Sequence, residues 1–180
     1  QLRQCGIDAQ ALPLIDIVPE PLAGRLLQVR QHLGDYAVAM FVSGNAVTGF
    51  MGSNQAAVQL QQALTAIETR AWSPGPRTTA ALRPAARIDQ PAPEAPQFDS
   101  ESLWAQVAPQ VRPGLRVLIV RGGDAAGSVA GRDWLAAQLT AAGAEVDQVL
   151  AYRRTAPRLD AADLARAAAA ARDGTLWLFS

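Results

Sequence analysis

Residues 116–154 read RVLIVRGGDAAGSVAGRDWLAAQLTAAGAEVDQVLAYRR, and this stretch decides the fold. The β-branched run Val117–Val120 is short and apolar, which predicts a strand buried on both faces. Arg121–Gly123 predicts a turn after it, because glycine lets the backbone bend sharply. Apolar residues then recur at helical spacing over Trp134–Ala142, and Ala144–Tyr152 is expected to form the next strand. Together these elements predict a βαβ unit with a parallel sheet.

The ends of these elements indicate where a ligand would bind. Gly143 follows the helix at the position where a C′ glycine ends it. In parallel α/β sheets, ligands lie beyond the carboxyl ends of the strands, here around Arg121–Arg132. The glycines do not fit the G-x-G-x-x-G pattern, and no acidic residue follows at the required distance, so a dinucleotide site is not indicated.

Composition narrows the function classes. The 180 residues carry no formal net charge, so neither nucleic acid nor an anionic membrane is an expected partner. All 16 basic residues are arginine, which excludes lysine Schiff-base chemistry and P-loop phosphate binding through lysine. The single Cys5 cannot form an internal disulfide, and His32 is the only histidine, interpreted as a solvated surface residue. With no bilayer-spanning apolar run and no leader pattern, we expect a cytoplasmic protein.

The other expected elements fill the chain on both sides of this unit. Extended segments or strands are expected at Ala11–Val18, Ala37–Val42, Thr69–Trp72, Arg87–Asp89 and Thr175–Phe179. Helices are expected at Glu20–Leu33, Val58–Ile67, Ala80–Ala86, 99–111 (capped by Asp99) and Asp160–Arg172.

Polar side chains follow several of the expected strands. Ser43 and Asn45 are good helix N-cap types, and capping is the favoured interpretation, with an anion at the helix N-terminus as the alternative. Thr78 is expected to cap the helix that follows Pro74–Arg77. Tyr152 stands where a strand leaves the sheet, a position that taken alone is more often a half-buried packing residue.

Several segments, in order, resemble the uroporphyrinogen-III synthase family. They are DYAVAMFVSGNAV (35–47), PGPRTTAAL (74–82), FDSESL (98–103), RVLIVRGG with the later GR (116–132) and GAEVDQVLAYRRTAP (143–157). ALPLIDIVP (11–19) and TLWLFS (175–180) resemble the family's linker and a late strand. The glycine loop is longer than in the family.

The resemblance implies an α/β fold of two doubly wound, flavodoxin-like parallel-sheet domains joined by a two-stranded linker. The linker would pair Leu14–Val18 with Val149–Arg153. Residues 19–151 would form the contiguous central domain, and residues 1–18 with 152–180 would be remnants of a domain assembled from both chain ends, incomplete in this chain.

The resemblance also implies a function: a cyclising hydro-lyase that converts linear hydroxymethylbilane to uroporphyrinogen III, with loss of water and inversion of the last ring, in haem biosynthesis. No metal or organic cofactor is implied, and a monomer is expected. Tyr152 matches the family's candidate proton donor. The positions matching substrate-binding residues are Ser43, Asn45, Thr78, Arg121, Gly122, Gly123, Arg132 and Ser180. For Arg132, a structural ion pair with a neighbouring helix is an equal alternative.

Two other interpretations remain open from the residues. The first is a hinged two-domain α/β protein that binds a small anionic metabolite without catalysis. The second is a one-domain flavodoxin-like receiver or interaction module. The missing acidic cluster after the first strand argues against it, and Leu14–Val18 would have no partner.

Overall fold

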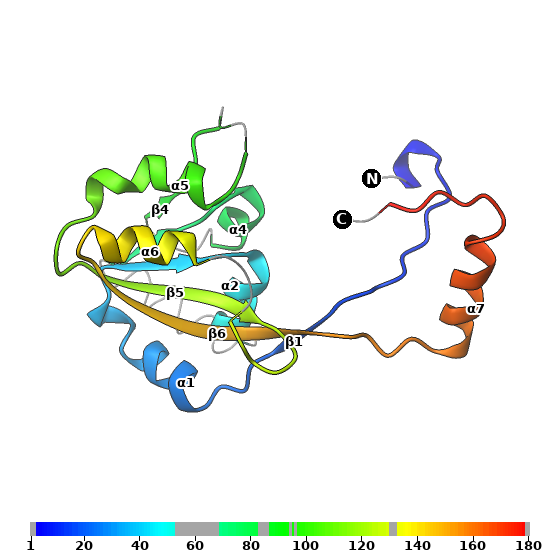
Figure 1. Cartoon of the computed structure of the whole chain (residues 1–180), viewed down its shortest axis with the longest axis horizontal. Coiled ribbons are helices and arrows are strands. Elements are labelled where there is room, and N and C mark those ends of the chain that lie inside the picture. Colours follow the sequence, from blue (N-terminus) through cyan, green and yellow to red (C-terminus); the bar gives the residue numbers. More distant parts are fainter. Residues whose placement is uncertain are drawn as a thin grey trace. The chain divides into compact units, whose positions relative to one another are not determined.

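The computed structural model describes residues 3–52, 69–82, 87–93, 95, 97–129 and 133–178. The chain divides into two compact units (Figure 1). Residues Ile17–Arg154 form the central unit, and Gln1–Asp16 with Thr155–Ser180 form the terminal unit.

The central unit is built on one sheet with the order β1-β6-β5-β2-β3-β4. The strands are β1 (Asp16–Pro19), β2 (Val38–Phe41), β3 (Arg70–Trp72), β4 (Ile88–Asp89), β5 (Arg116–Gly123) and β6 (Glu145–Thr155). The neighbours β6-β5, β5-β2, β2-β3 and β3-β4 pair in parallel, which confirms the predicted parallel sheet. β1 lies beside β6, and the Glu20 amide donates to the Ala151 carbonyl at 3.0 Å.

The strand order places a switch point between β2 and β5. The chain runs outward from β2 through β3 to β4, then returns to the other side of β2 with β5 and β6. The sheet is therefore doubly wound, as expected, although in the flavodoxin arrangement only one strand lies on the first side of the first strand. In such sheets a crevice forms outside the carboxyl ends of the two strands at the switch point.

Two hydrophobic cores cover the two faces of this sheet. One contains side chains of α1 (Gly24–Gln31) and α2 (Gly44–Met51), with residues of α4 (Pro76–Ala81) packed against it. The other contains side chains of α5 (Ser100–Val107) and α6 (Trp134–Ala141). Short 3-10 helices complete the description: η1 (Arg3–Cys5), η2 (Leu33–Asp35) and η3 (Ala108–Gln110).

Alternation along the central strands explains why both faces are apolar. In β5, Leu118 and Val120 point into the first core, whereas Val117 and Ile119 point into the second. All four are buried, as the continuous apolar run predicts for a parallel strand covered on both sides.

Several helices begin or end at residues whose backbone conformation or side-chain hydrogen bond fixes the helix end. Gly143 adopts a φ of +85°, and the amides of Gly143 and Ala144 donate to the carbonyls of Thr140 and Leu139, which closes α6 as predicted. Asp99 caps α5 by accepting from the Ser102 amide at 2.8 Å. In the terminal unit, α7 (Ala161–Ala170) begins with a capping box between Asp160 and Asp163.

Several expectations differ from the structure, and one falls outside its description. The helix expected at Ala80–Ala86 is instead α4 at Pro76–Ala81. The predicted turn Arg121–Gly123 is wrong, because β5 continues through Gly123, with a register shift against β6 between Arg121 and Gly122. The helix expected from Glu20 begins at Gly24. Residues 175–178 form no strand: the terminal unit has no described ladder for them to join, and Leu176 is 96% exposed. The helix expected at Val58–Ile67 lies outside the described residues.

Candidate functional site

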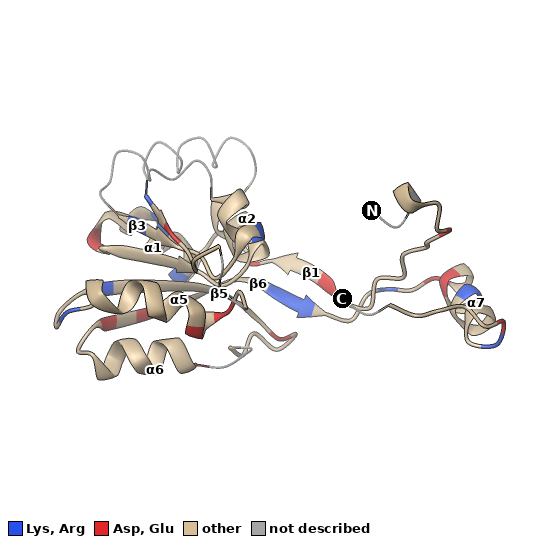
Figure 2. Ribbon diagram, turned by 90° about the horizontal axis from the view of Figure 1, so that it is seen from above, with Lys and Arg blue, Asp and Glu red and all other residues tan. Residues whose placement is uncertain are grey.

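Three polar or glycine positions meet at the carboxyl ends of the central strands. Ser43 follows β2, Gly122 lies near the end of β5, and Tyr152 lies in the last third of β6. Since β2 and β5 flank the switch point, this is the edge at which the fold places a ligand crevice. Figure 2 shows that β6 ends in a basic stretch, formed by Arg153 and Arg154.

Tyr152 is the central side chain of this group. Its side chain belongs to the core over α1 and α2, and the residue is 1% exposed. The hydroxyl lies 3.2 Å from the Ser43 hydroxyl and accepts a hydrogen bond from Arg154 Nη2 at 3.1 Å. The Arg154 guanidinium also lies over the ring, 5.5 Å from its centroid. The phenol is therefore held in one place by a hydroxyl and a cation.

Gly122 makes the position of the Tyr152 ring possible. A Cβ at residue 122 would lie 2.3 Å from Tyr152 Cζ and 2.7 Å from its hydroxyl oxygen. The glycine at this position is thus explained by the close approach of an aromatic ring from the neighbouring strand, since any side chain would occupy the ring's space.

Ser43 combines capping with its contact to the phenol. Its Oγ accepts from the Ala46 amide at 3.2 Å, which caps α2 as the favoured interpretation states. Because that bond uses an oxygen lone pair, the serine proton remains available to Tyr152 or to another acceptor. Asn45, the second residue of α2, is exposed.

Arg121 is committed to protein contacts. Its side chain is 6% exposed, and Nη1 donates to Asp133, directly before α6, and to Gln148 Oε1 of β6 at 2.7 Å. The guanidinium therefore ties α6 to the sheet, so any role of Arg121 in holding a substrate rests on its backbone.

The expectation that Thr78 caps α4 is wrong. The N-cap is Gly75, in an extended conformation with Pro76 as the first helical residue, and Thr78 lies buried in the first turn. The hydroxyl contacts at this end come instead from Thr79, which donates to Ser73 Oγ at 2.9 Å and lies 2.6 Å from Gln90 Oε1.

The remaining predicted positions are less informative. Gly123 is buried at the end of β5, and its neighbour Asp124 accepts from the amides of Ala126 and Ser128, which closes a tight loop after the strand. Arg132 and Ser180 lie outside the described residues.

Arg154 is the residue of this group that sequence reasoning missed. Side chains two residues apart in a strand point to the same face, so the pair Tyr152 and Arg154 carried a usable signal. Its neighbour Arg153 points to the other face and pairs with Glu20.

Neither a metal centre nor a membrane-crossing helix accompanies this edge in the described residues. In that part of the chain, no group of three or more histidine, cysteine or acidic side chains could hold a metal ion. Nor does any helix within it combine the length and apolar character needed to cross a bilayer.

The fold and this edge define a doubly wound α/β protein with a buried phenol at the carboxyl ends of its strands. The family model described as uroporphyrinogen-III synthase HemD matches residues 1–180. The chain belongs to the uroporphyrinogen-III synthase family, as its motifs predicted.

One solved structure supports the fold, and a second is similar over most of this chain. A mutant uroporphyrinogen III synthase from Thermus thermophilus is similar at 17% identity with a TM-score of 0.54, and the match covers 97% of this chain and 63% of that one. The wild-type protein from the same organism is 17% identical with a TM-score of 0.47, covering 93% of this chain and 60% of that one. The chain thus spans less than two thirds of the length of these structures. A search of curated proteins finds no match.

Proposed function

We propose that this chain acts as a uroporphyrinogen-III synthase, which cyclises hydroxymethylbilane with loss of water and inversion of the last ring. The observation that carries the proposal is the family match over residues 1–180. The arrangement of Tyr152 at the switch-point edge supports it, because a single fixed proton donor suits a reaction whose leaving group is a hydroxyl.

In the proposed mechanism Tyr152 is the general acid. Its phenol gives a proton to the hydroxyl of the terminal hydroxymethyl group, the carbon–oxygen bond breaks, and water leaves. The pyrrole nitrogen supplies the electron pair that expels the water, and loss of its N–H proton, with return of a proton to the phenolate, gives the neutral azafulvene. The protein then holds this reactive intermediate in the folded geometry from which the ring closes with the last pyrrole inverted.

Arg154 is proposed as a positioning residue for this step. It donates to the phenol oxygen at 3.1 Å, so the Tyr152 proton is directed away from the guanidinium, toward Ser43 or a ligand. Tyr152 is 1% exposed, so the proposed mechanism requires its hydroxyl to become exposed when the substrate binds.

The substrate's carboxylates are proposed to bind around this acid. Backbone amides at Arg121–Gly123 and the start of α2, with Ser43 and Asn45, would donate hydrogen bonds to them. Thr78, Arg132 and Ser180 are the further substrate-binding positions we propose from their match to the family's motifs.

The remaining features of the proposal concern the whole protein. We propose a central domain at residues 19–151 and a second domain containing residues 1–18 and 152–180. The proposal is supported by the division of the chain into two compact units after residues 16 and 154. We also propose that the protein is a cytoplasmic monomer that needs no cofactor.

The test is turnover of hydroxymethylbilane by the full chain. We expect the purified protein to form the type III ring isomer, whereas spontaneous closure forms the type I isomer, and chromatography of the oxidised products separates the two. Binding of hydroxymethylbilane without an excess of type III product would overturn the enzymatic proposal and favour a binding protein.

A further inference from the structure

A hollow lies at the edge of the sheet opposite Tyr152. Its volume is about 590 Å³, and its walls come from the amino ends of β2, β3 and β5 and from the residue before β4. Because the strands are parallel, this edge is the full strand length away from Tyr152. The residues around Tyr152 do not line it.

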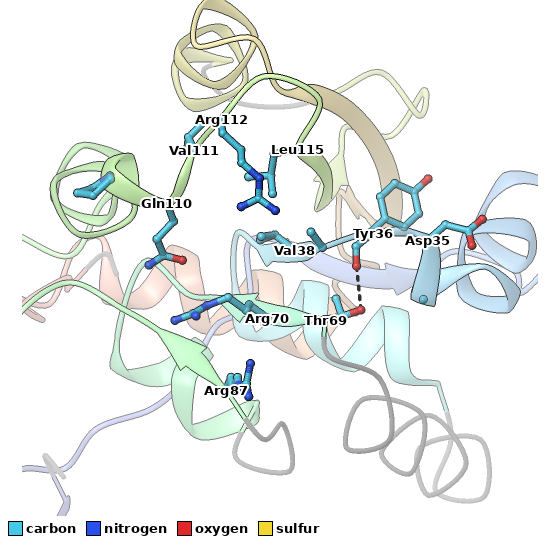
Figure 3. A pocket seen from close by; sticks show the side chains of 13 residues that line it. Asp35, Tyr36, Val38, Thr69, Arg70, Arg87, Gln110, Val111, Arg112 and Leu115 are labelled. Carbon is cyan, nitrogen blue, oxygen red and sulfur yellow. Dashed lines mark hydrogen bonds between the residues drawn. The ribbon is translucent and has the colours of Figure 1, made fainter.

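Three arginines converge on this hollow from different elements. Figure 3 shows Arg112 reaching in from one side and Arg70 and Arg87 lying on the other. The positive charge of Arg70 is balanced by Asp89, because Arg70 Nε and Nη2 both donate to the Asp89 carboxylate at 2.8 Å. That bidentate pair raises the pKa of Arg70 and lowers the pKa of Asp89, so it stays charged and rigid at neutral pH.

Two other polar side chains of the wall, Thr69 and Tyr36, are occupied by protein contacts as well. The Thr69 hydroxyl donates to the Tyr36 carbonyl at 2.9 Å, and the Tyr36 hydroxyl bonds Asp147 at 2.8 Å. Asp35, the acidic residue in the wall, lies 4.0 Å from Arg116 and 3.8 Å from His32. These contacts leave little negative charge for the arginines inside the hollow.

Arg87 and Arg112 differ from these groups. Within the described part of the chain, neither forms an ion pair or a side-chain hydrogen bond, and both are exposed. Two cations facing one hollow repel each other unless an anion lies between them. Guanidinium groups bind carboxylates through two parallel hydrogen bonds, which makes them suited to this task.

The floor of the hollow is apolar. Val38 and Leu115 line it and are 2% and 6% exposed, and Pro109 and Val111 add to the same wall. An inorganic phosphate would leave this surface uncovered, whereas a short carbon chain would cover it.

We propose that this hollow binds a small organic dicarboxylate, with one carboxylate on Arg112, the other on Arg87, and the carbon chain against Val38 and Leu115. The Arg70–Asp89 pair fixes the wall between the two cationic ends. This site does not depend on the reaction proposed above, since it uses none of the groups around Tyr152.

The experiment is calorimetric titration of the full chain with succinate and glutarate, with propionate and inorganic phosphate as comparison probes. We expect saturable binding of a dicarboxylate at least tenfold tighter than propionate or phosphate. Arg87→Gln and Arg112→Gln should each weaken it about tenfold, the loss expected for one charge-assisted pair. Arg172→Gln removes one exposed charge in the terminal unit and should leave the affinity unchanged.

Three results would overturn the proposal. The first is no saturable binding of either dicarboxylate, and the second is phosphate binding as tight as dicarboxylate binding. The third is equal loss of affinity in Arg172→Gln, which would indicate a nonspecific charge effect. Both hollow variants change exposed side chains, and an unaltered circular dichroism spectrum and melting temperature establish that they are folded.

Discussion

The chain contains two tyrosines, both in the central unit and both buried, yet their hydroxyls have opposite surroundings. Tyr36, near the amino ends of the strands, bonds the Asp147 carboxylate at 2.8 Å. Tyr152, near the carboxyl ends, accepts from Arg154 at 3.1 Å and lies beside the Ser43 hydroxyl. The Arg116 guanidinium lies over the Tyr36 ring, and the Arg154 guanidinium lies over the Tyr152 ring.

The comparison identifies which phenol can give up a proton. Burial and the hydrogen bond to Asp147 raise the pKa of Tyr36, so its proton is held between two oxygens. Within the described residues, no acidic group hydrogen-bonds the Tyr152 hydroxyl, and the cation that does bind it takes a lone pair and leaves the proton. A buried tyrosine is thus an ordinary packing residue at one edge and a candidate acid at the other.

The largest expected effect comes from moving one ring and leaving the other in place. Gly122→Ala puts a methyl group 2.3 Å from Tyr152 Cζ, so the ring must shift. We expect a loss of about 3 kcal/mol of unfolding free energy, at the upper end for overpacking, and a fall in melting temperature of roughly 10 °C. Urea unfolding measures the first quantity.

Gly44→Ala is the matched control for this variant. Its new methyl group would lie 3.9 Å from the closest atom, the Arg77 carbonyl, which is ordinary contact. Equal stability of the two variants would mean that Gly122 is not required by the Tyr152 ring.

Removing the hydroxyl from each tyrosine tests the comparison directly. Tyr152→Phe keeps the ring and deletes the acid, so we expect kcat for type III product to fall about 10²-fold, the lower end for general acid catalysis. Tyr36→Phe deletes an equally buried hydroxyl and should leave kcat unchanged. Full activity of a folded Tyr152→Phe protein, or equal losses in both variants, would remove Tyr152 from the mechanism.

The arginines over the two rings give a smaller, third contrast. Arg154→Gln should lower kcat about tenfold with little change in KM, because it loosens the acid without removing a uniform binding contact. Arg154→Lys keeps a cationic donor and should recover part of the loss. Arg116→Gln removes the guanidinium over the Tyr36 ring and is the control. A rise in KM with constant kcat in Arg154→Gln would indicate that Arg154 contacts the substrate instead of positioning the acid.

The smallest expected effect is the raised pKa of Tyr36, which a titration measures. Tyr152→Phe leaves Tyr36 as the single tyrosine, and its absorbance should report a pKa above the ordinary value near 10. Because the folded pKa is raised, stability from this group is present below pH ~10 and is lost as the pH rises through the folded value. Asp147→Asn should lower the Tyr36 pKa only in part, since burial remains the larger cause. An unshifted Tyr36 in Tyr152→Phe would contradict the assigned contact.

Sequence reasoning succeeds where the cause is local. The run Val117–Val120, the helix end at Gly143 and the cap at Asp99 each depend on residues within one turn or strand, and the structure confirms them. The capping role expected of Thr78 is wrong because an extended Gly75 before Pro76 starts that helix earlier.

The site depends on contacts that the sequence does not place side by side. A glycine pair after an apolar run predicts a turn at Gly122, whereas the cause of this glycine is a ring 30 residues later on the next strand. The contacts of Tyr152 with Ser43 and of Tyr36 with Asp147 span 109 and 111 residues. Only Arg154, two residues from Tyr152, could have been found from strand alternation.

The close approach of Gly122 to Tyr152 also limits the order in which this chain can mutate. A larger residue at position 122 is tolerated only after the ring at 152 has been replaced by something smaller. Replacing Tyr152 first deletes the proposed acid, so the intermediate protein would have lost catalytic activity. The reverse order passes through a protein destabilised by about 3 kcal/mol. Because each single substitution is harmful, neither of these two positions on adjacent strands is expected to change alone.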